Sequence, residues 1–219
     1  MKINTDGVLL GAIAAADNPK TVLDIGTGTG VIALMLAQKY LTANIDAVEI
    51  DLAAAQTAER NFKASPFSDR LAVYSMDFES YFDRFTESKY DLIVSNPPFY
   101  IDSLKSPGRQ KSLAKHADAD FFERLVKCIS KHLTPKGSCW VILPLTTGHM
   151  VEEIAGTFNM FPQKTVKVQS YTHSGAHRTI LSFGFDNVRV EINNFVIYEA
   201  KGIYSAVYKQ LLKSYFLAF

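Results

Sequence analysis

The chain contains little cysteine, and the cysteines it has do not form a pattern that would stabilise a fold. Its 219 residues include only Cys128 and Cys139, which have no paired spacing and no neighbouring cluster of ligand residues. Disulfide frameworks and zinc sites need several closely patterned cysteines, so both are disfavoured. So little cysteine fits a reducing compartment, and we expect a cytoplasmic protein with no bound metal.

Long hydrophobic runs and an excess of one charge are also missing. No apolar stretch approaches the ~20 residues that cross a bilayer, and the first residues lack the pattern of an export signal. Twenty-three basic residues against 22 acidic ones leave a net charge of +1, which does not by itself indicate a polyanionic partner. We expect a protein that does not associate with a membrane and that is a monomer.

Short apolar runs alternate with amphipathic stretches over the first two thirds of the chain. Predicted strands cover residues 21–25, 44–50, 71–76, 90–95 and 139–143, and predicted helices cover residues 31–40, 52–63 and 117–133. This alternation indicates an α/β fold with helices packed on a parallel sheet. No repeat or linker divides the sequence, so we expect residues 1–219 to form a single domain.

The last third of the chain has a weaker strand pattern. Residues 164–171 and 179–185 are predicted strands, and their poor alternation favours antiparallel pairing at an edge of the sheet over burial on both faces. Residues 189–198 predict a further hairpin strand, and residues 204–215 have the spacing of a closing helix.

A glycine-rich turn follows the first predicted strand. Residues 24–30 read Asp-Ile-Gly-Thr-Gly-Thr-Gly. Gly26 and Gly28 permit backbone conformations and a close ligand approach that a Cβ would obstruct, and the next helix begins with unpaired N–H groups. The dinucleotide fingerprint is G-x-G-x-x-G, whereas this turn is G-x-G-x-G preceded by Asp24. The spacing favours a nucleoside or an amino-acid carboxylate over NAD.

Acidic residues also end the next two predicted strands. Glu49 lies where a carboxylate accepts hydrogen bonds from both ribose hydroxyls, and we prefer it to Asp51 because a strand end holds a side chain more rigidly. Asp77 lies where it can accept a hydrogen bond from an adenine amine. Each acid taken alone could instead cap a turn or a helix. Three acids at three successive strand ends, Asp24 included, favour one shared ligand site.

The segment Ser95-Asn96-Pro97-Pro98-Phe99 ends the fourth predicted strand, in the crevice where open α/β sheets bind ligands. The prolines restrict the backbone, so the Asn96 amide oxygen and the carbonyl that follows it are held at a fixed separation. Two such acceptors can hold a planar amine and localise its lone pair. Phe99 offers a face on which an unstacked base can lie. The alternative is a strand terminator with a capping Asn and a core Phe.

Taken together, these motifs resemble class I methyltransferases that carry an N-P-P-[FY] turn, and most closely the bacterial tRNA(Val) adenine-37 N6-methyltransferase family. The similarity also covers the opening residues 2–11, residues 46–49 and the pair His177-Arg178. It implies a Rossmann-like fold with helices on both faces of a seven-stranded, mostly parallel sheet whose last strand is antiparallel. It also implies S-adenosyl-L-methionine as cofactor and N6-methylation of an adenine in tRNA, at position 37 of tRNA(Val).

The same resemblance implies roles for individual residues. The cofactor would be held at its methionine end by Thr5 and Asp6, along its length by Asp24, Gly26 and Gly28, at the ribose by Glu49, and at the adenine by Asp77 and Phe78. The catalytic turn would consist of Asn96, Pro97, Pro98 and Phe99, with Asn96 also beside the cofactor.

Basic residues near the catalytic turn are candidates for binding RNA phosphates. Segment 101–115, expected to be a loop, has four basic residues against Asp102. A second group ends in His177 and Arg178, which we expect to flank the entrance. Tyr100 is either a stacking surface or a loop anchor. The helical spacing of the aromatic residues near the C-terminus indicates that they pack in the core. The predicted RNA-binding residues are Tyr100, Lys105, Arg109, Lys111, Lys115, His177 and Arg178.

Other functions remain open at this point. The same chemistry could act on a guanine of ribosomal RNA, on adenine in DNA or on a glutamine side chain. A non-catalytic RNA-binding module would not need the intact cofactor residues Asp24, Glu49 and Asp77. A nicotinamide oxidoreductase is disfavoured by the glycine spacing.

Overall fold

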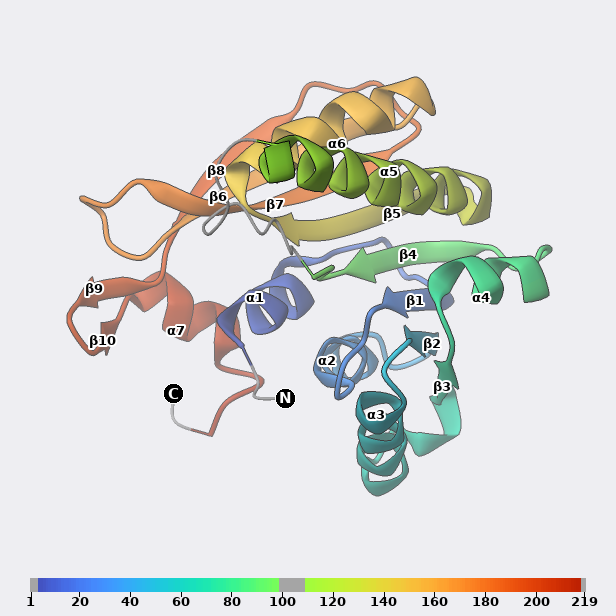
Figure 1. Ribbon diagram of the computed structural model, residues 1–219. Coiled ribbons are helices and arrows are strands. Elements are labelled where there is room, and N and C mark those ends of the chain that lie inside the picture. The colour runs from blue at the N-terminus through green and yellow to red at the C-terminus, as the bar shows by residue number, and fades with distance from the viewer. Residues whose placement is uncertain (1–3, 99–108, 218–219) are drawn as a thin grey trace.

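The structure is a computed structural model that describes residues 4–98 and 109–217 (Figure 1). Eight strands form one sheet in the order β3-β2-β1-β4-β5-β7-β6-β8. These strands are β1 (Thr21–Ile25), β2 (Asn44–Glu49), β3 (Leu71–Ser75), β4 (Tyr90–Ser95), β5 (Leu133–Leu143), β6 (Phe161–Gln169), β7 (Ala176–Gly184) and β8 (Glu191–Val196). A separate hairpin pairs β9 (Tyr198–Ala200) with β10 (Ile203–Tyr204).

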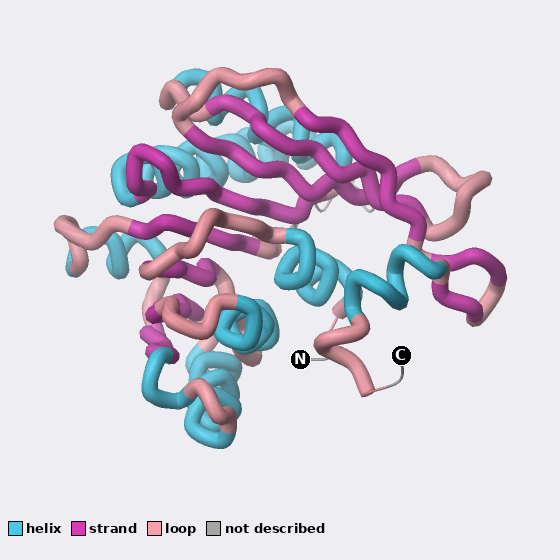
Figure 2. The backbone as a smooth tube through the Cα atoms, turned by 180° about the vertical axis from the view of Figure 1, so that it is seen from behind, coloured by secondary structure: helices cyan, strands magenta, loops and turns pink. Residues whose placement is uncertain are grey.

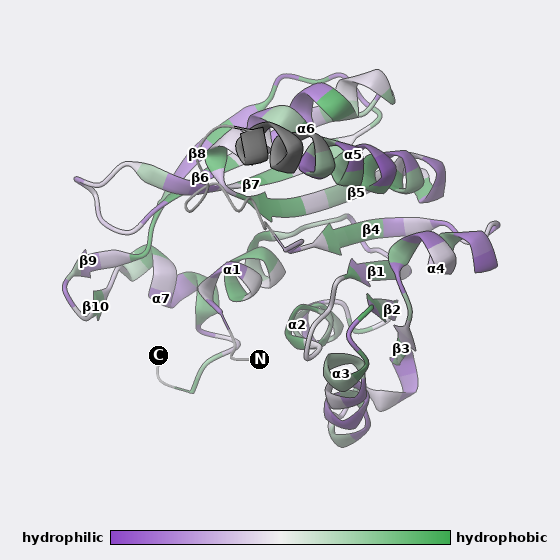
Figure 3. Ribbon diagram, in the orientation of Figure 1, coloured by the Kyte–Doolittle hydropathy of each residue, from purple (hydrophilic) through white to green (hydrophobic). Residues whose placement is uncertain are grey.

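Helices cover both faces of the large sheet (Figures 1 and 2). One apolar core lies under α1, α2, α3 and α7, and a second lies under α4, α5 and α6. In Figure 3 the hydrophobic colour runs along the central strand β5, between these layers. The helices are α1 (Thr5–Ile13), α2 (Val31–Lys39), α3 (Leu52–Ala64), α4 (Phe78–Arg84), α5 (Arg109–His132), α6 (Leu145–Thr157) and α7 (Ala206–Leu212), with a short 3-10 turn η1 (Ser68–Arg70). Among the helices of the described residues, none has the length and apolar character needed to cross a membrane.

The strand pairing confirms the α/β class and corrects the strand count. Strands β1 to β5 pair in parallel, and β7 is antiparallel to β5 as the resemblance implies. The expected total of seven is wrong, because β8 adds an eighth strand that pairs in parallel with β6. Residues 189–198 therefore contain a strand, but it is not the expected hairpin strand. Strands β6 and β7 pair antiparallel as expected, but β7 lies inside the sheet, with Thr179–Gly184 buried, and not at its edge. The weakly patterned β8, exposed from Glu191 to Asn194, occupies the edge instead.

Helix α5 begins earlier than its sequence pattern predicted. It starts at Arg109 rather than at residue 117, so Arg109, Lys111 and Lys115 lie on its first turns and not in a loop. The amphipathic pattern is clear only further along the helix, where Leu125 and Ile129 are buried against the sheet.

The topology gathers loops from distant parts of the chain at one edge of the sheet. Because β1 to β5 are parallel, their carboxyl ends meet there. Strand β7 runs the opposite way and so begins at this edge, while β6 and β8 end at it. The β1–α2 turn, the ends of β2 and β4 and the start of β7 are thereby brought together.

Candidate active site at the carboxyl edge of the sheet

The glycine-rich turn has the backbone conformation that its sequence predicted. Gly26, Gly28 and Gly30 all adopt left-handed φ values of 73°, 60° and 87°. The turn is anchored on the neighbouring strand, since the N–H groups of Gly26 and Thr27 donate to the Val48 carbonyl at 2.8 and 3.1 Å. The backbone therefore folds back over the end of β2 and leads directly into α2.

Two of these glycines are required for different reasons, and we predict different consequences when each is replaced. A Cβ on Gly26 would meet no atom within 4 Å, whereas a Cβ on Gly30 would lie 2.5 Å from Cε1 of Phe62. Gly26→Ala should cost about 1–2 kcal/mol of stability from backbone strain alone, but should block a ligand that approaches the open face of the turn. Gly30→Ala adds overpacking and should cost about 2–5 kcal/mol in total. Urea denaturation and cofactor titration of both variants measure these effects, and equal stability of the two would contradict the assignment.

Asp24 is a fully buried carboxyl group beneath this turn, with an exposed fraction of 0%. Its Oδ2 accepts hydrogen bonds from the Thr27 hydroxyl at 2.6 Å and from the Ala33 N–H at 3.1 Å. Its Oδ1 is buried without a hydrogen-bond partner among the described residues. Burial raises the pKa of Asp24 to about 7, and the nearby Glu49 charge acts in the same direction.

Glu49 links the end of β2 to the glycine turn. One carboxylate oxygen accepts from the Gly28 N–H and the other from the Asp51 N–H, both at 2.8 Å. The side chain is only 8% exposed. Within the described part of the chain no lysine or arginine forms an ion pair with Asp24 or Glu49. Two neighbouring carboxyl groups without a basic partner form an electrostatic environment that favours a cationic ligand.

Ile50 is a site candidate that sequence reasoning missed. It follows Glu49 directly and is 74% exposed. An exposed apolar side chain beside two hydrogen-bonding carboxylates suits a flat ligand with an apolar face and polar edges. The available signal was an isoleucine between two acids, at the junction of β2 and α3.

Asp77 caps a helix, which was the alternative to a ligand-binding role. Its two carboxylate oxygens accept from the Ser80 N–H at 2.8 Å and the Ser80 hydroxyl at 2.6 Å, so it is the N-cap of α4. These bonds hold the pKa of Asp77 below its usual range. Each oxygen keeps a further lone pair, so capping does not prevent contact with a ligand. Phe78 is half-buried, and its ring packs edge-on against the ring of Phe121, with the two ring centroids 5.7 Å apart.

The Asn-Pro-Pro corner follows β4, which is the neighbour of β1. Ser95 pairs in register with Ile25, and its hydroxyl donates to the Ile25 carbonyl at 2.9 Å. Asn96 is half-buried, Pro97 is buried and Pro98 is exposed. The corner and the glycine turn are therefore continuations of two adjacent strands.

The first turn of α1 packs against this corner, which the sequence did not indicate. The Asn4 side chain caps α1 by accepting from the Gly7 N–H at 2.7 Å. A Cβ added to Gly7 would lie 3.7 Å from Nδ2 of Asn96. The first turn of α1 therefore lies within van der Waals range of the Asn96 amide, and Asn4 fixes the start of the helix there.

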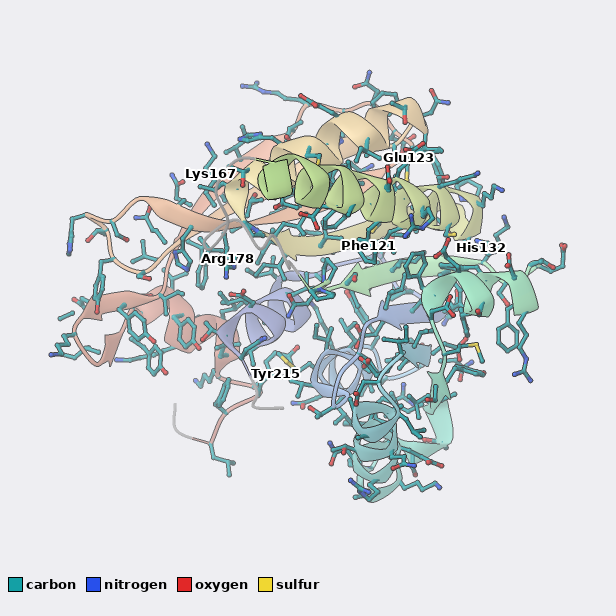
Figure 4. All side chains as sticks on the ribbon, in the orientation of Figure 1. Phe121, Glu123, His132, Lys167, Arg178 and Tyr215 are labelled. Carbon is teal, nitrogen blue, oxygen red and sulfur yellow. The ribbon has the colours of Figure 1, made fainter. Side chains whose placement is uncertain are left out.

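Asp6 and Arg178 were predicted to contact different ligands, and the structure pairs them. Nε of Arg178 lies 2.8 Å from Oδ2 of Asp6, and their side chains are 28% and 21% exposed. Figure 4 shows Arg178 between β7 and α1. Thr5, the first residue of α1, and His177, next to Arg178, are both exposed. The ion pair joins the start of β7 to the first turn of α1.

Several predicted residues lie outside the part that is described. Phe99, Tyr100 and Lys105 belong to the undescribed segment 99–108, and the side chains of Arg109, Lys111 and Lys115 are likewise outside the described residues. In the described ranges, Cys128 and Cys139 are free, and no group of acidic, histidine and cysteine side chains is arranged to hold a metal ion.

Fold and site together define a Rossmann-like class I methyltransferase. Residues 5–165 match the model of the methyltransferase small domain family. A relative from Pedobacter heparinus, a tRNA1(Val) (adenine(37)-N6)-methyltransferase, is 44% identical over 219 residues, covering 100% of this chain and 92% of the relative. One from Bacteroides thetaiotaomicron with the same name is 38% identical, covering 99% and 91%. The chain belongs to the methyltransferase small domain family and, within it, to the tRNA1(Val) (adenine(37)-N6)-methyltransferase family.

A solved structure supports the fold. The crystal structure of a predicted O-methyltransferase from Agrobacterium tumefaciens superposes with a TM-score of 0.74 at 15% identity, covering 95% of this chain and 96% of that one. At this identity the similarity concerns the fold alone.

The cofactor of this family, S-adenosylmethionine, fits the residues present. It carries two positive charges, on its ammonium and sulfonium groups. These charges suit a site in which Oδ1 of Asp24 has no hydrogen-bond partner and the Glu49 carboxylate has no basic partner among the described residues. The open face of Gly26 leaves room that a Cβ would fill. Glu49 and Ile50 offer acceptors and an apolar surface for a nucleoside.

Proposed function

We propose that this enzyme transfers a methyl group from S-adenosylmethionine to the N6 amine of an adenine in tRNA, at position 37 of tRNA(Val). The observation that carries the proposal is the position of the Asn96 corner. It continues β4 beside the glycine turn that continues β1, with the Ser95 hydroxyl bonded to Ile25 between them. The shared name of the full-length relatives supports the choice of substrate.

Asn96 would act as one of two acceptors for the adenine amine. An exocyclic amine is a poor nucleophile because its lone pair is delocalised into the ring. The Asn96 side-chain oxygen and the carbonyl that follows would each accept one N–H, which favours the geometry in which the lone pair points outward. Pro97 and Pro98 limit backbone motion, so the acceptors are arranged before the base arrives. When bound, S-adenosylmethionine supplies an electrophilic methyl group, so alignment alone provides much of the acceleration.

We assign the remaining residues to two groups. The cofactor would be bound by Thr5, Asp6, Asp24, Gly26, Gly28, Glu49, Asp77 and Phe78, and the RNA by Phe99, Tyr100, Lys105, Arg109, Lys111, Lys115, His177 and Arg178. Because Arg178 forms an ion pair with Asp6, it would also orient the first turn of α1. This role would be additional to its contact with RNA. We further propose that residues 1–219 act as one domain, as a monomer in the cytoplasm, where tRNA is the available substrate.

The test is methylation of a defined RNA. A tRNA(Val) transcript is incubated with the protein and labelled S-adenosylmethionine, then digested so that the methylated nucleoside can be identified. We expect N6-methyladenosine, and no label in the same transcript with guanosine at position 37. Transfer to ribosomal RNA, DNA or a protein glutamine in place of the tRNA would overturn the substrate assignment. The absence of transfer to all four would instead support a non-catalytic RNA-binding protein.

A further inference from the structure

Five aromatic rings form a continuous series from the β6–β7 loop to α7. We call this series the aromatic ladder, and its members are His173, Tyr171, Tyr198, Tyr204 and Tyr208. Successive ring centroids are 5.4, 5.7, 5.1 and 4.5 Å apart, with interplanar angles of 12°, 36°, 22° and 6°. The inner end at Tyr208 is buried and the outer end at His173 is exposed.

The ladder lies at the same edge of the sheet as the candidate active site. Strands β6 and β8 end there and β7 begins there, so the ladder and the pair His177-Arg178 share one loop region. The two segments that carry the rings are bonded, since the Tyr198 N–H donates to the Ser170 carbonyl at 2.8 Å. Figures 1 and 2 both show the β6–β7 loop beside the β9–β10 hairpin, on the side of α1 where its N-terminus lies.

The loop that carries the two outer rings is held by local hydrogen bonds. The Ser174 hydroxyl accepts from the Tyr171 N–H at 2.9 Å and donates to the Tyr171 carbonyl at 2.8 Å, which closes the turn that presents His173. The backbone of this turn is therefore fixed, and the His173 ring already stacks on Tyr171, so a planar group that stacks on His173 need not order the loop first.

The segments that carry the ladder are basic, although the whole chain is nearly neutral. Residues 166–178 and 197–217 contain a single acid, Glu199, in a protein whose net charge is only +1. The lysines of these segments are all exposed. The cationic residues are Lys167, Arg178, Lys201, Lys209 and Lys213.

We propose that the aromatic ladder is a base-stacking surface for the substrate RNA, with His173 as the outermost ring on which an unpaired base next to the target adenine lies. Exposed aromatic rings among cations are the combination that binds single-stranded nucleic acid without sequence readout. Tyr198, Tyr204 and Tyr208 pack in or against the apolar core, whereas His173 at the outer end is exposed. The inference rests on the proposed function for the identity of the RNA.

The test uses the anticodon arm of tRNA(Val) as a hairpin RNA, with 2-aminopurine beside position 37. Stacking quenches the fluorescence of this base, so titration with the whole protein reports both affinity and stacking. We expect quenching with the wild type, and for His173→Ala a loss of quenching with a roughly tenfold weaker Kd, the value of one base–ring stack. His173→Phe should restore both, because it keeps an aromatic ring and removes only the ring nitrogens. His149→Ala, at an exposed histidine on α6, is the matched control and should behave as wild type.

Each result has a defined meaning. Unchanged Kd and quenching in His173→Ala would overturn the proposal, and an equal loss in His173→Phe would assign the effect to the imidazole nitrogens rather than to stacking. Thermal midpoint and cofactor Kd should not change in any variant, and a change in either would indicate a packing role for the ring. Binding is measured without methyl transfer, so a wild type that stacks this RNA but does not methylate it would refute the proposed function and leave the ladder supported.

Discussion

Asn96→Ala should lower the rate of methyl transfer by about 10²–10³-fold, the usual cost of removing one positioned hydrogen-bonding group from a site of developing charge. The loss should appear in the single-turnover rate at saturating RNA and cofactor, because the amide acts on the reacting amine. The cofactor Kd should change by less than about threefold, as expected of a substitution outside its main contacts. Asn96→Asp keeps an oxygen acceptor and should retain more activity than Asn96→Ala.

Asn44→Ala is a suitable control for this experiment. Asn44 is an exposed asparagine at the opposite end of β2, on the same sheet, and its replacement should leave the single-turnover rate unchanged. An Asn96→Ala enzyme with the wild-type rate would remove Asn96 from the mechanism. A proportional loss of cofactor affinity would instead move Asn96 to the cofactor site.

Cofactor affinity should fall as pH drops below about 7, and Asp24→Asn should abolish that dependence. In the ligand-free protein burial raises the pKa of Asp24 to about 7, whereas a cationic ligand favours the ionised carboxylate. Binding below pH 7 must therefore release a proton, which weakens affinity by about tenfold per pH unit. In Asp24→Asn the loss of a charged acceptor should weaken Kd by about 10–100-fold at pH 8, with no pH slope.

The raised pKa of Asp24 also makes the stability of the folded protein depend on pH. The folded-state pKa of Asp24 lies above its ordinary value of 3.8, so the unfolded chain loses the proton first. The stability that the neutral form contributes is fully present below about pH 4, declines as pH rises to about 7 and is level above that. Asp24→Asn removes this decline. The free energy of unfolding of the variant, relative to that of the wild type, should therefore increase as pH rises from 4 to 7.

Calorimetric titration at pH 6, 7 and 8 in buffers of different ionisation enthalpy measures the released proton, and urea denaturation over pH 4–7 measures the stability slope. Asp17→Asn, at an exposed acid in the α1–β1 connection, is the control for general charge effects. A wild-type Kd that is constant from pH 6 to 8 would show that Asp24 does not exchange a proton on binding.

The local sequence determined the parallel half of the sheet and the motifs at its edge. Strands β1 and β4 have the predicted bounds, because short apolar runs between glycine and proline signals depend on local periodicity. The left-handed glycines follow from a turn in which only glycine is free of steric cost. These local features, with the Asn-Pro-Pro corner, were enough to recognise the family.

Only the tertiary structure decided how distant segments complete the site. Helix α1 was not predicted because it is buried continuously from Gly7 to Ala12 and so lacks an amphipathic period. Its contact with Asn96, the pairing of Asp6 with Arg178 172 positions away and the aromatic ladder all depend on contacts between residues that are remote in sequence. No local pattern encodes such contacts, because they form only when the strand order of the sheet brings the segments together.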